Sequence, residues 1–188
     1  MPVSDELLMR RFQAGDRSAF ADLVRRHRSH ALHFGLRMLH DPDMAEDVAQ
    51  EAFARILLHP DRWTGRSRFT SYLFAILKNL CVDELRWRSR WQGCGDAGVL
   101  ETPDTAPPPD EQVVVAERDR RLHAALAGLS PDHRAALVLR EFQELAYEEI
   151  AEVMGWSAAK TKVTIYRARL ALGRAFTAAE GGHADGAR

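Results

Sequence analysis

An acidic stretch rich in proline and glycine divides this chain and limits what can fold as one unit. Residues 93–113, GCGDAGVLETPDTAPPPDEQV, contain three glycines, four prolines and no basic residue. Such a segment cannot bury a core, and its like charges keep it extended. We therefore predict a flexible acidic linker over residues 93–118. It joins two small domains, residues 1–92 and 119–178, and a disordered tail follows at residues 179–188.

The charge of the chain follows the same division. The net charge is −1, yet the first unit has 15 Lys and Arg against 12 Asp and Glu, and the second has 9 against 7. The neutral total therefore hides two mildly basic units, which bears on partners rather than on fold. No apolar run approaches the length of a signal peptide core or a membrane span, so we expect a cytoplasmic protein without membrane insertion.

Helical periodicity accounts for the whole first unit, and β-alternation of useful length does not occur there. A short helix is expected over residues 4–13, ended by Gly15, followed by a longer helix capped by Asp16. Asp43 is expected to cap a third helix after the break at residues 41–43. The sequence therefore predicts an all-α fold for this unit.

The outer face of the third helix carries Asp47, Gln50 and Glu51, opposite an apolar face that runs from Ala45 to Leu57. These side chains are too widely spread for acid–base catalysis, which needs carboxylates in a shared cleft. Two interpretations remain open at this point: a solvated face, or a docking surface for a basic partner.

Cations and aromatic rings are concentrated in the loop at residues 59–68 and at the start of the fourth helix. Single-stranded nucleic acid is held by such a mixture, because cations follow the phosphates while rings stack on unpaired bases. For Phe69 and Tyr72 a position in the core is an equal alternative. For Trp63, Arg66 and Arg68 we favour the interpretation as nucleic-acid contacts.

The stretch Tyr147–Leu172 predicts a helix-turn-helix. Gly155 suits the left-handed end of its first helix, and Ser157 suits the N-cap of its second helix. One stripe of the second helix is set to face inward, and the opposite side is basic. An ordinary helical hairpin with a solvated basic face is the alternative. The inward stripe is Thr161, Ile165, Ala168 and Leu172; the outward residues are Lys160, Val163, Thr164 and Arg167, flanked by Lys162, Tyr166 and Arg169.

No catalytic, metal or cofactor site is predicted. His27, His30 and His33 turn through most of a helix rather than sharing one face, and His27 lies on a buried seam. Cys81 and Cys94 are too few for a disulfide framework or a four-cysteine zinc site. Nothing resembles a phosphate-binding glycine loop or a nucleophile elbow.

Three motifs, in this order around the linker, resemble the extracytoplasmic function (group IV, sigma-70) family of RNA polymerase sigma factors, and the resemblance covers nearly the whole chain. AEDVAQEAF (Ala45–Phe53) is similar to the region that docks on the clamp helices of the polymerase β′ subunit. WTGRSRFTSYLFAILKNLCVDELR (Trp63–Arg86) is similar to the regions that melt the promoter −10 element and capture an unstacked base. EEIAEVMGWSAAKTKVTIYRARLAL (148–172) is similar to the region that reads the −35 element.

The resemblance implies partners and roles for particular residues. The partners are core RNA polymerase through its β′ clamp and β subunit, promoter DNA in duplex and single-stranded form, and an anti-sigma factor. The implied polymerase contacts are Asp47, Gln50 and Glu51. The implied −10 contacts are Trp63, Arg66, Arg68, Phe69, Tyr72, Asn79 and Arg86. The implied −35 contacts are Ser157, Lys160, Lys162, Val163, Thr164, Tyr166, Arg167 and Arg169.

One departure from the family pattern affects specificity. The family usually has Gly-Thr-Val where this chain has Ala159-Lys160-Thr161, which changes the start of the expected recognition helix. A stand-alone helix-turn-helix regulator that binds duplex operators as a dimer is the alternative function, and a metal-dependent enzyme ranks third. Binding to core polymerase separates the first two.

Overall fold

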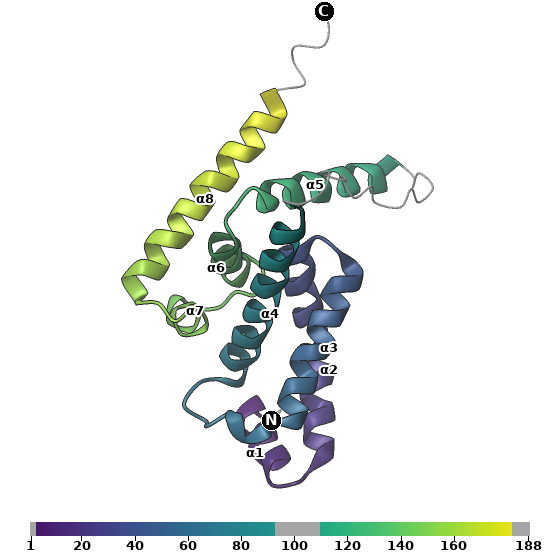
Figure 1. Ribbon diagram of the computed structural model, residues 1–188, viewed down its shortest axis with the longest axis vertical. Helices are drawn as coiled ribbons and strands as arrows, with labels where there is room; N and C mark the ends of the chain where they lie inside the picture. The colour runs from purple at the N-terminus through teal and green to yellow at the C-terminus, as the bar shows by residue number, and fades with distance from the viewer. Residues whose placement is uncertain (1–2, 93–109, 182–188) are drawn as a thin grey trace, which may run out of the picture.

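The computed structural model describes residues 3–92 and 110–181, and in these ranges every regular element is helical (Figure 1). The expected all-helical class with two helical regions is confirmed. The first region comprises α1 (Asp5–Gln13), α2 (Arg17–Leu39), α3 (Pro42–Leu58), the short 3₁₀ turn η1 (Pro60–Arg62) and α4 (Phe69–Gln92). The second comprises α5 (Asp110–Ala127), α6 (Pro131–Glu141), α7 (Tyr147–Met154) and α8 (Ala158–Gly181). Most of the predicted linker lies outside the described residues, but α5 begins within it.

Side-chain caps set the ends of the early helices. Asp16 accepts hydrogen bonds from the backbone N–H groups of Ser18 and Ala19, as predicted, and Gly15 before it has φ +101°. The prediction that Asp43 caps the third helix is wrong. Asp41 is the N-cap and accepts from the Met44 N–H at 3.0 Å, because Pro42 occupies the first helical position, where its missing N–H costs nothing.

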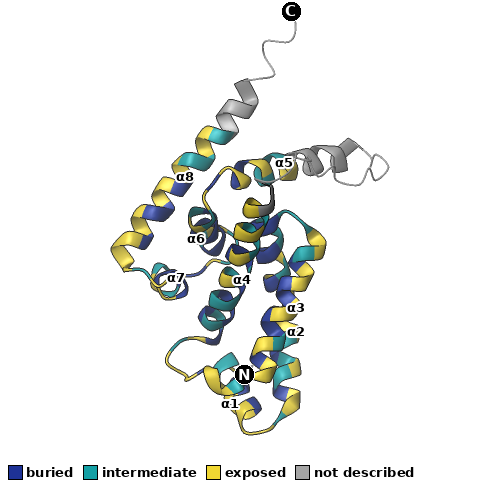
Figure 2. Cartoon of the chain, viewed as in Figure 1, coloured by how far each residue is buried: buried dark blue, intermediate teal, exposed yellow. Residues whose placement is uncertain are grey.

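Buried residues recur at helical spacing along α2 and α3, but some residues predicted to face inward lie at the edge of the core. Figure 2 shows buried residues recurring along one side of α2 and α3. Leu57, predicted to face inward, is 48% exposed, because α3 ends one residue later and no neighbouring helix covers its last turn fully. His27 is buried and satisfied, since its Nε2 lies 2.7 Å from Asp5 Oδ2.

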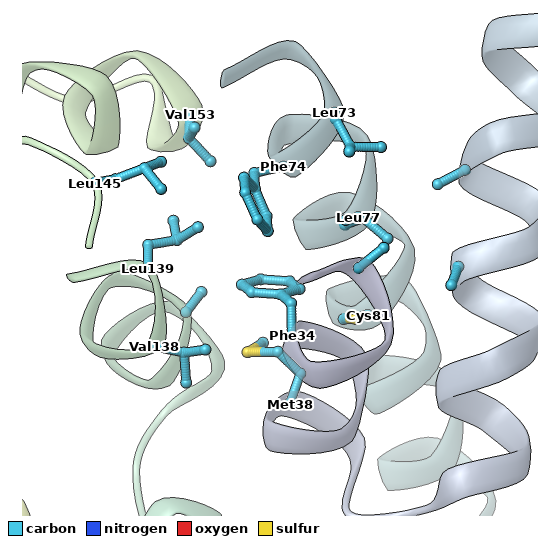
Figure 3. Close-up of a cluster of buried hydrophobic side chains, with 14 of the residues drawn as sticks. Phe34, Met38, Leu73, Phe74, Leu77, Cys81, Val138, Leu139, Leu145 and Val153 are labelled. Atoms are coloured by element: carbon cyan, nitrogen blue, oxygen red, sulfur yellow. The ribbon is translucent and has the colours of Figure 1, made fainter. Parts of the chain in front are cut away.

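The two helical regions pack against each other through a shared apolar core. Figure 3 shows Phe34 and Phe74 facing α6 and α7, with Leu139 and Val153 on the opposite side. The two rings meet edge to face, with centroids 5.5 Å apart and an interplanar angle of 62°. Edge-to-face contacts of this kind add to the stabilisation from apolar burial. The sequence did not predict this packing.

A buried arginine links the two regions at the end of this core. The Arg134 guanidinium, in α6, donates hydrogen bonds to the carbonyl of Met38 in the last turn of α2, to that of Ala127 at the end of α5, and to that of Leu129 just beyond it. Those carbonyls belong to helix C-termini, where the backbone lacks internal partners. Arg134 is only 5% exposed, so these bonds offset the desolvation of its charge.

Several basic groups surround His40 at the same joint. His40 ends α2 in the left-handed conformation, with φ +58°, and its ring lies 5.1 Å from the ring of His123 in α5. Both ring nitrogens are buried without a hydrogen-bond partner. Burial, and then the charges of Arg134, His123 and Arg37, lower the pKa of His40 to about 4. Burial and Arg37 also lower the pKa of His123, which the nearby Asp119 partly opposes. The joint is therefore most stable with neutral imidazoles.

Among the described residues, no helix combines the length and the apolar character needed to span a bilayer.

Acidification is expected to destabilise the packed form through His40. Because the folded pKa lies below the ordinary value, this contribution is present above pH 6.5 and is lost as the pH falls toward 4. Between pH 7 and pH 4.5 the free energy of unfolding of the parent protein should fall by about 1–2 kcal/mol more than that of His40→Asn, after allowance for solvent screening. Asn tolerates the left-handed backbone but does not titrate. Urea unfolding at both pH values measures the difference, and equal losses would contradict the prediction.

Candidate nucleic-acid interface

The solvent side of α3 presents the acidic and amide residues singled out in the sequence. Asp47, Gln50 and Glu51 are all exposed, and Glu51 accepts from Arg55 at 2.7 Å. Beside them, a groove of about 290 Å³ runs between α2 and α3, with Gln50 on its rim. Its floor is apolar and comprises Phe20, Val24, Leu32, Ala49, Phe53 and Leu57. Polar and apolar groups therefore share one accessible face.

The loop between α3 and α4 is held from within by Trp63. This side chain is only 3% exposed, and its Nε1–H donates to the Ser67 carbonyl at 3.2 Å. Phe69, which begins α4, is fully buried. In this conformation neither ring can stack on a base, so both support the loop rather than line its surface. Of the alternatives that the sequence left open for Phe69, the structure has the core position.

The same loop is held from outside by α1. The Gln13 side-chain amide donates to the carbonyls of Pro60 and Trp63, at 2.7 and 2.8 Å. Glu6, on the same helix, accepts from the Phe69 N–H at 3.4 Å. Sequence reasoning missed both contacts. The only available signal was that Glu6 and Gln13 are seven residues apart, which is about two helical turns and places them on the same face of α1.

The cations of the loop remain accessible. Arg66 and Arg68 are exposed and, with Asp5, Glu6 and the loop backbone, line a polar hollow of about 510 Å³. Arg68 donates to Glu149 of α7 at 2.8 Å, but its side chain is 72% exposed. An ion pair this exposed stabilises by no more than about 1 kcal/mol, so a phosphate can replace it. Tyr72 is half-buried, and burial raises the pKa of its hydroxyl.

A polar stripe continues from the loop along α4. Asn79, Asp83 and Arg86 recur at steps of four and three residues, and all three are exposed. Arg88 differs from its basic neighbours because it turns inward, where it donates to Glu84 and Asp41 at 2.9 and 3.0 Å. The exposed stripe is therefore Asn79, Asp83 and Arg86, and Arg88 fixes α4 against the start of α3.

Local capping builds the predicted helix-turn-helix. Gly155 ends α7 with φ +66°, a left-handed conformation that glycine adopts without strain. Ser157 then caps α8, since its Oγ accepts from the Lys160 N–H at 3.2 Å. Thr161 is fully buried, and its hydroxyl donates to the Ser157 carbonyl at 3.0 Å. Thr161 stands where the family pattern described above has Val, and the hydroxyl that it adds is thus hydrogen-bonded within the turn.

The outward face of α8 matches the prediction except at one position. Val163 is 48% exposed and Tyr166 is 61% exposed, although both are large and apolar in part. Thr164, predicted to face outward, is only 8% exposed. It follows Lys160 by four residues, and because a helical turn takes only 3.6 residues, Thr164 is rotated from Lys160 toward the inward stripe. The exposed residues of this face are Ser157, Lys160, Lys162, Val163, Tyr166, Arg167 and Arg169.

Several basic side chains of α8 are oriented by neighbours. Lys160 Nζ lies 4.5 Å from the centroid of the Trp156 ring, which restricts its position. Arg169 donates to Glu141 of α6 at 2.8 Å, and this carboxylate raises the pKa of the guanidinium. These contacts hold the cations on one face of the helix before any ligand arrives.

Within the described residues, His, Cys, Asp and Glu side chains form no group of three that could hold a metal ion. Burial raises the pKa of the Cys81 thiol to about 12, so this cysteine stays protonated at neutral pH. Cys94 lies outside the described residues.

Comparison with known proteins matches both helical regions. The sigma-70 region 2 family model matches residues 23–91, and the sigma-70 region 4 model matches residues 119–172. RNA polymerase sigma factor YlaC of Bacillus subtilis is 32% identical over 164 residues, which cover 86% of this chain and 94% of that protein. The ECF RNA polymerase sigma factor SigW of the same species is 28% identical over 172 residues, covering 87% and 92%. The solved structure of the sigma factor RpoE from Bartonella quintana, in complex with the anti-sigma factor NepR, shares the fold, with a TM-score of 0.67 and 24% identity over 84% of this chain and 96% of that chain.

Removal of the Trp63 ring should destabilise the fold and open the loop. Trp63→Ala is expected to lower the free energy of unfolding by about 3–5 kcal/mol, because it leaves a cavity in the core. The loop arginines should then be cleaved faster by trypsin. Trp87→Ala provides the control, since Trp87 is 51% exposed and its loss should cost less than about 1 kcal/mol. Urea unfolding measures both, and equal costs would contradict the buried role.

Proposed function

Because this chain belongs to the sigma-70 family, as an extracytoplasmic function (ECF) sigma factor, we propose that three of its exposed surfaces divide the work of initiation. The protein is an alternative sigma factor that directs transcription initiation, and it catalyses no reaction itself. Core RNA polymerase and promoter DNA are its partners. The proposal concerns which residues meet each partner.

The division of labour follows the two helical regions. Residues 1–92 dock on core polymerase and melt the −10 element, and residues 119–178 read the −35 element. Residues 93–118 link the two activities, and residues 179–188 form a tail. The exposed, opposite characters of α3, which is acidic, and α8, which is basic, support separate protein and DNA partners.

The α3 face, Asp47, Gln50 and Glu51, docks on the β′ clamp. Exposed carboxylates suit a basic partner helix, and the apolar groove beside Gln50 gives that helix a surface to bury. Charge sets the orientation of such a complex, and the groove supplies most of the contact area. The β subunit contacts the second region.

The loop and α4 hold the melted −10 strand. Arg66 and Arg68 bind its phosphates, Tyr72 of α4 contacts an unstacked base, and Asn79 and Arg86 extend the contact along α4. Trp63 and Phe69 act from the core by fixing the loop that presents these groups.

The exposed face of α8 reads the −35 duplex. The main support for the proposal is that the basic side chains of this helix are exposed together on one face. Lys160, Val163 and Arg167 approach base edges, with Val163 suited to a thymine methyl. Phosphates are held by the flanking Lys162, Tyr166 and Arg169 and by the helix N-terminus at Ser157. Thr164 is too buried to reach a base while α8 keeps its present packing.

Two further assignments follow from the family. We expect an anti-sigma factor to bind this chain, as NepR binds the structurally similar RpoE. We also expect the protein to act in the cytoplasm, where polymerase and promoters are found.

The docking surface can be tested by charge reversal. Asp47→Lys should weaken binding to core polymerase by about 10-fold, because it places a cation against a basic partner. Glu152→Lys makes the same change of charge at an exposed position of α7 and should bind normally. Co-elution with core polymerase and run-off transcription on sheared genomic DNA measure binding and function for all three proteins. Normal binding by Asp47→Lys would contradict this docking surface, and failure of the parent protein to bind would contradict the proposed function.

The −35 assignment separates base readers from phosphate contacts. Arg167→Ala should weaken −35 recognition by about 1–3 kcal/mol and relax selectivity at one base pair. Lys162→Ala should instead weaken binding to all sequences alike. It should also reduce the slope of log K against log salt concentration by about one, because one phosphate contact is lost. Holoenzyme binding to promoters with single −35 substitutions, at several salt concentrations, tests both. Unchanged selectivity with Arg167→Ala would refute its role as a base reader.

A further inference from the structure

One face of α1 lies along the loop that contains Arg66 and Arg68. Glu6, Arg10 and Gln13 recur at steps of four and three residues, so they share this face. Gln13 contacts the start of the loop and Glu6 contacts its end, at the first N–H of α4. Arg10 lies near the middle, where its guanidinium is within 4 Å of the position that a side chain at Gly65 would take.

The Gln13 amide is suited to this position by its hydrogen-bonding capacity. Its two N–H groups meet two carbonyl oxygens, of Pro60 and Trp63, at 2.7 and 2.8 Å. A carbonyl can only accept, so a side chain without donors cannot replace this pair of bonds. The two bonds link Gln13 to residues that lie 47 and 50 positions further along the chain.

Because α1 is itself fixed, it can serve as a template for the loop. Leu8, Met9 and Phe12 are buried, and the Phe12 ring stacks on that of Phe20 at 4.8 Å. At its other end, Asp5 pairs with His27 and with Arg26, whose Nη1 lies 2.9 Å away. The loop therefore takes its shape from a rigid element that contains none of the proposed DNA contacts.

We propose that Gln13 is a positioning residue for promoter melting: its amide fixes the backbone of residues 60–63, and thereby places Arg66 and Arg68 for the −10 strand. This inference rests on the proposed function of the loop. Gln13 is exposed, so after its removal water can reach the two carbonyls. Loss of the amide should therefore loosen the loop while the fold keeps its stability. A geometry error of about 1 Å in a site is enough to reduce its activity strongly.

The experiment compares variants of similar size in the complete holoenzyme. Gln13→Met keeps the length of the side chain and removes both donors. Gln13→Glu places carboxylate oxygens against two carbonyl oxygens and should be worse. Arg11→Met is the control, since Arg11 lies on the same helix but pairs with Asp16, away from the loop. The promoter is the strongest one recovered by run-off transcription on genomic DNA.

Three measurements distinguish positioning from general damage. Permanganate reactivity of thymines in the −10 element should appear about 10-fold more slowly with Gln13→Met, as expected for the loss of two hydrogen bonds. Trypsin cleavage in the loop should become faster. Affinity for core polymerase and the thermal midpoint should match those of the parent protein and of Arg11→Met.

The outcomes separate this inference from the function on which it rests. Normal melting with Gln13→Met, alongside loss of melting with Arg66→Ala and Arg68→Ala, would overturn the role of Gln13 and leave the function intact. A lower thermal midpoint and weaker polymerase binding with Gln13→Met would show that the residue is merely structural. No thymine reactivity with the parent holoenzyme would overturn the proposed function, and the inference with it.

Discussion

One buried guanidinium joins the two helical regions at the end of their shared apolar core. Arg134 lies at the point where the C-terminal ends of α2 and α5 meet α6, and it donates to carbonyls of both ends. Each helix end has a partial negative charge and carbonyls without internal partners, so a fixed cation satisfies both at once. An apolar residue of the same length would leave those carbonyls buried and unpaired, at a cost of about 1–3 kcal/mol for each group. The bond to Met38 ties α6 to the last turn of α2.

The same anchor concentrates positive charge at the joint, which limits how strongly the regions can hold together. Arg37 lies close to it, and the lowered pKa values of His40 and His123 keep both imidazoles neutral beside these two guanidinium charges. On the solvent side the regions are joined by the exposed pair of Arg68 with Glu149, which contributes little. The packed form also leaves Asn79 and Arg86 of α4 and the proposed DNA residues of α8 exposed. Packing of the two regions is thus compatible with access to each surface, and Arg68 exchanges its partner in the other region, Glu149, for DNA.

Most local features could be predicted from the sequence, apart from the cap of α3 and the orientation of Thr164, whereas contacts between distant residues could not. Helix periods, the glycine at residue 155 and the caps at Asp16 and Ser157 act over a few residues, so the helices and the helix-turn-helix could be predicted. Trp63 was predicted to contact nucleic acid because the sequence of the loop gives no sign that the core reaches into it. Thr164 was misplaced by a small error in helical phase. The sequence of α6 shows that the helix has an apolar face. It cannot show that this face packs on α2 of the first region as well as on helices of its own region.

The two proposed DNA-binding surfaces therefore differ in how their shape is determined. The recognition helix α8 is set by its own turn, since Gly155 and Ser157 fix where it begins and the buried Thr161 satisfies its hydroxyl within four residues. Substitutions on its outer face, such as Lys160 in place of the usual threonine, can change the bases it reads without disturbing the fold. The loop before α4 has no such autonomy, because its backbone bonds lead to Gln13 and its interior to Trp63. In the proposed function, −10 recognition by this loop also depends on Gln13, outside the loop, so a comparison limited to the loop sequence would miss part of what determines it.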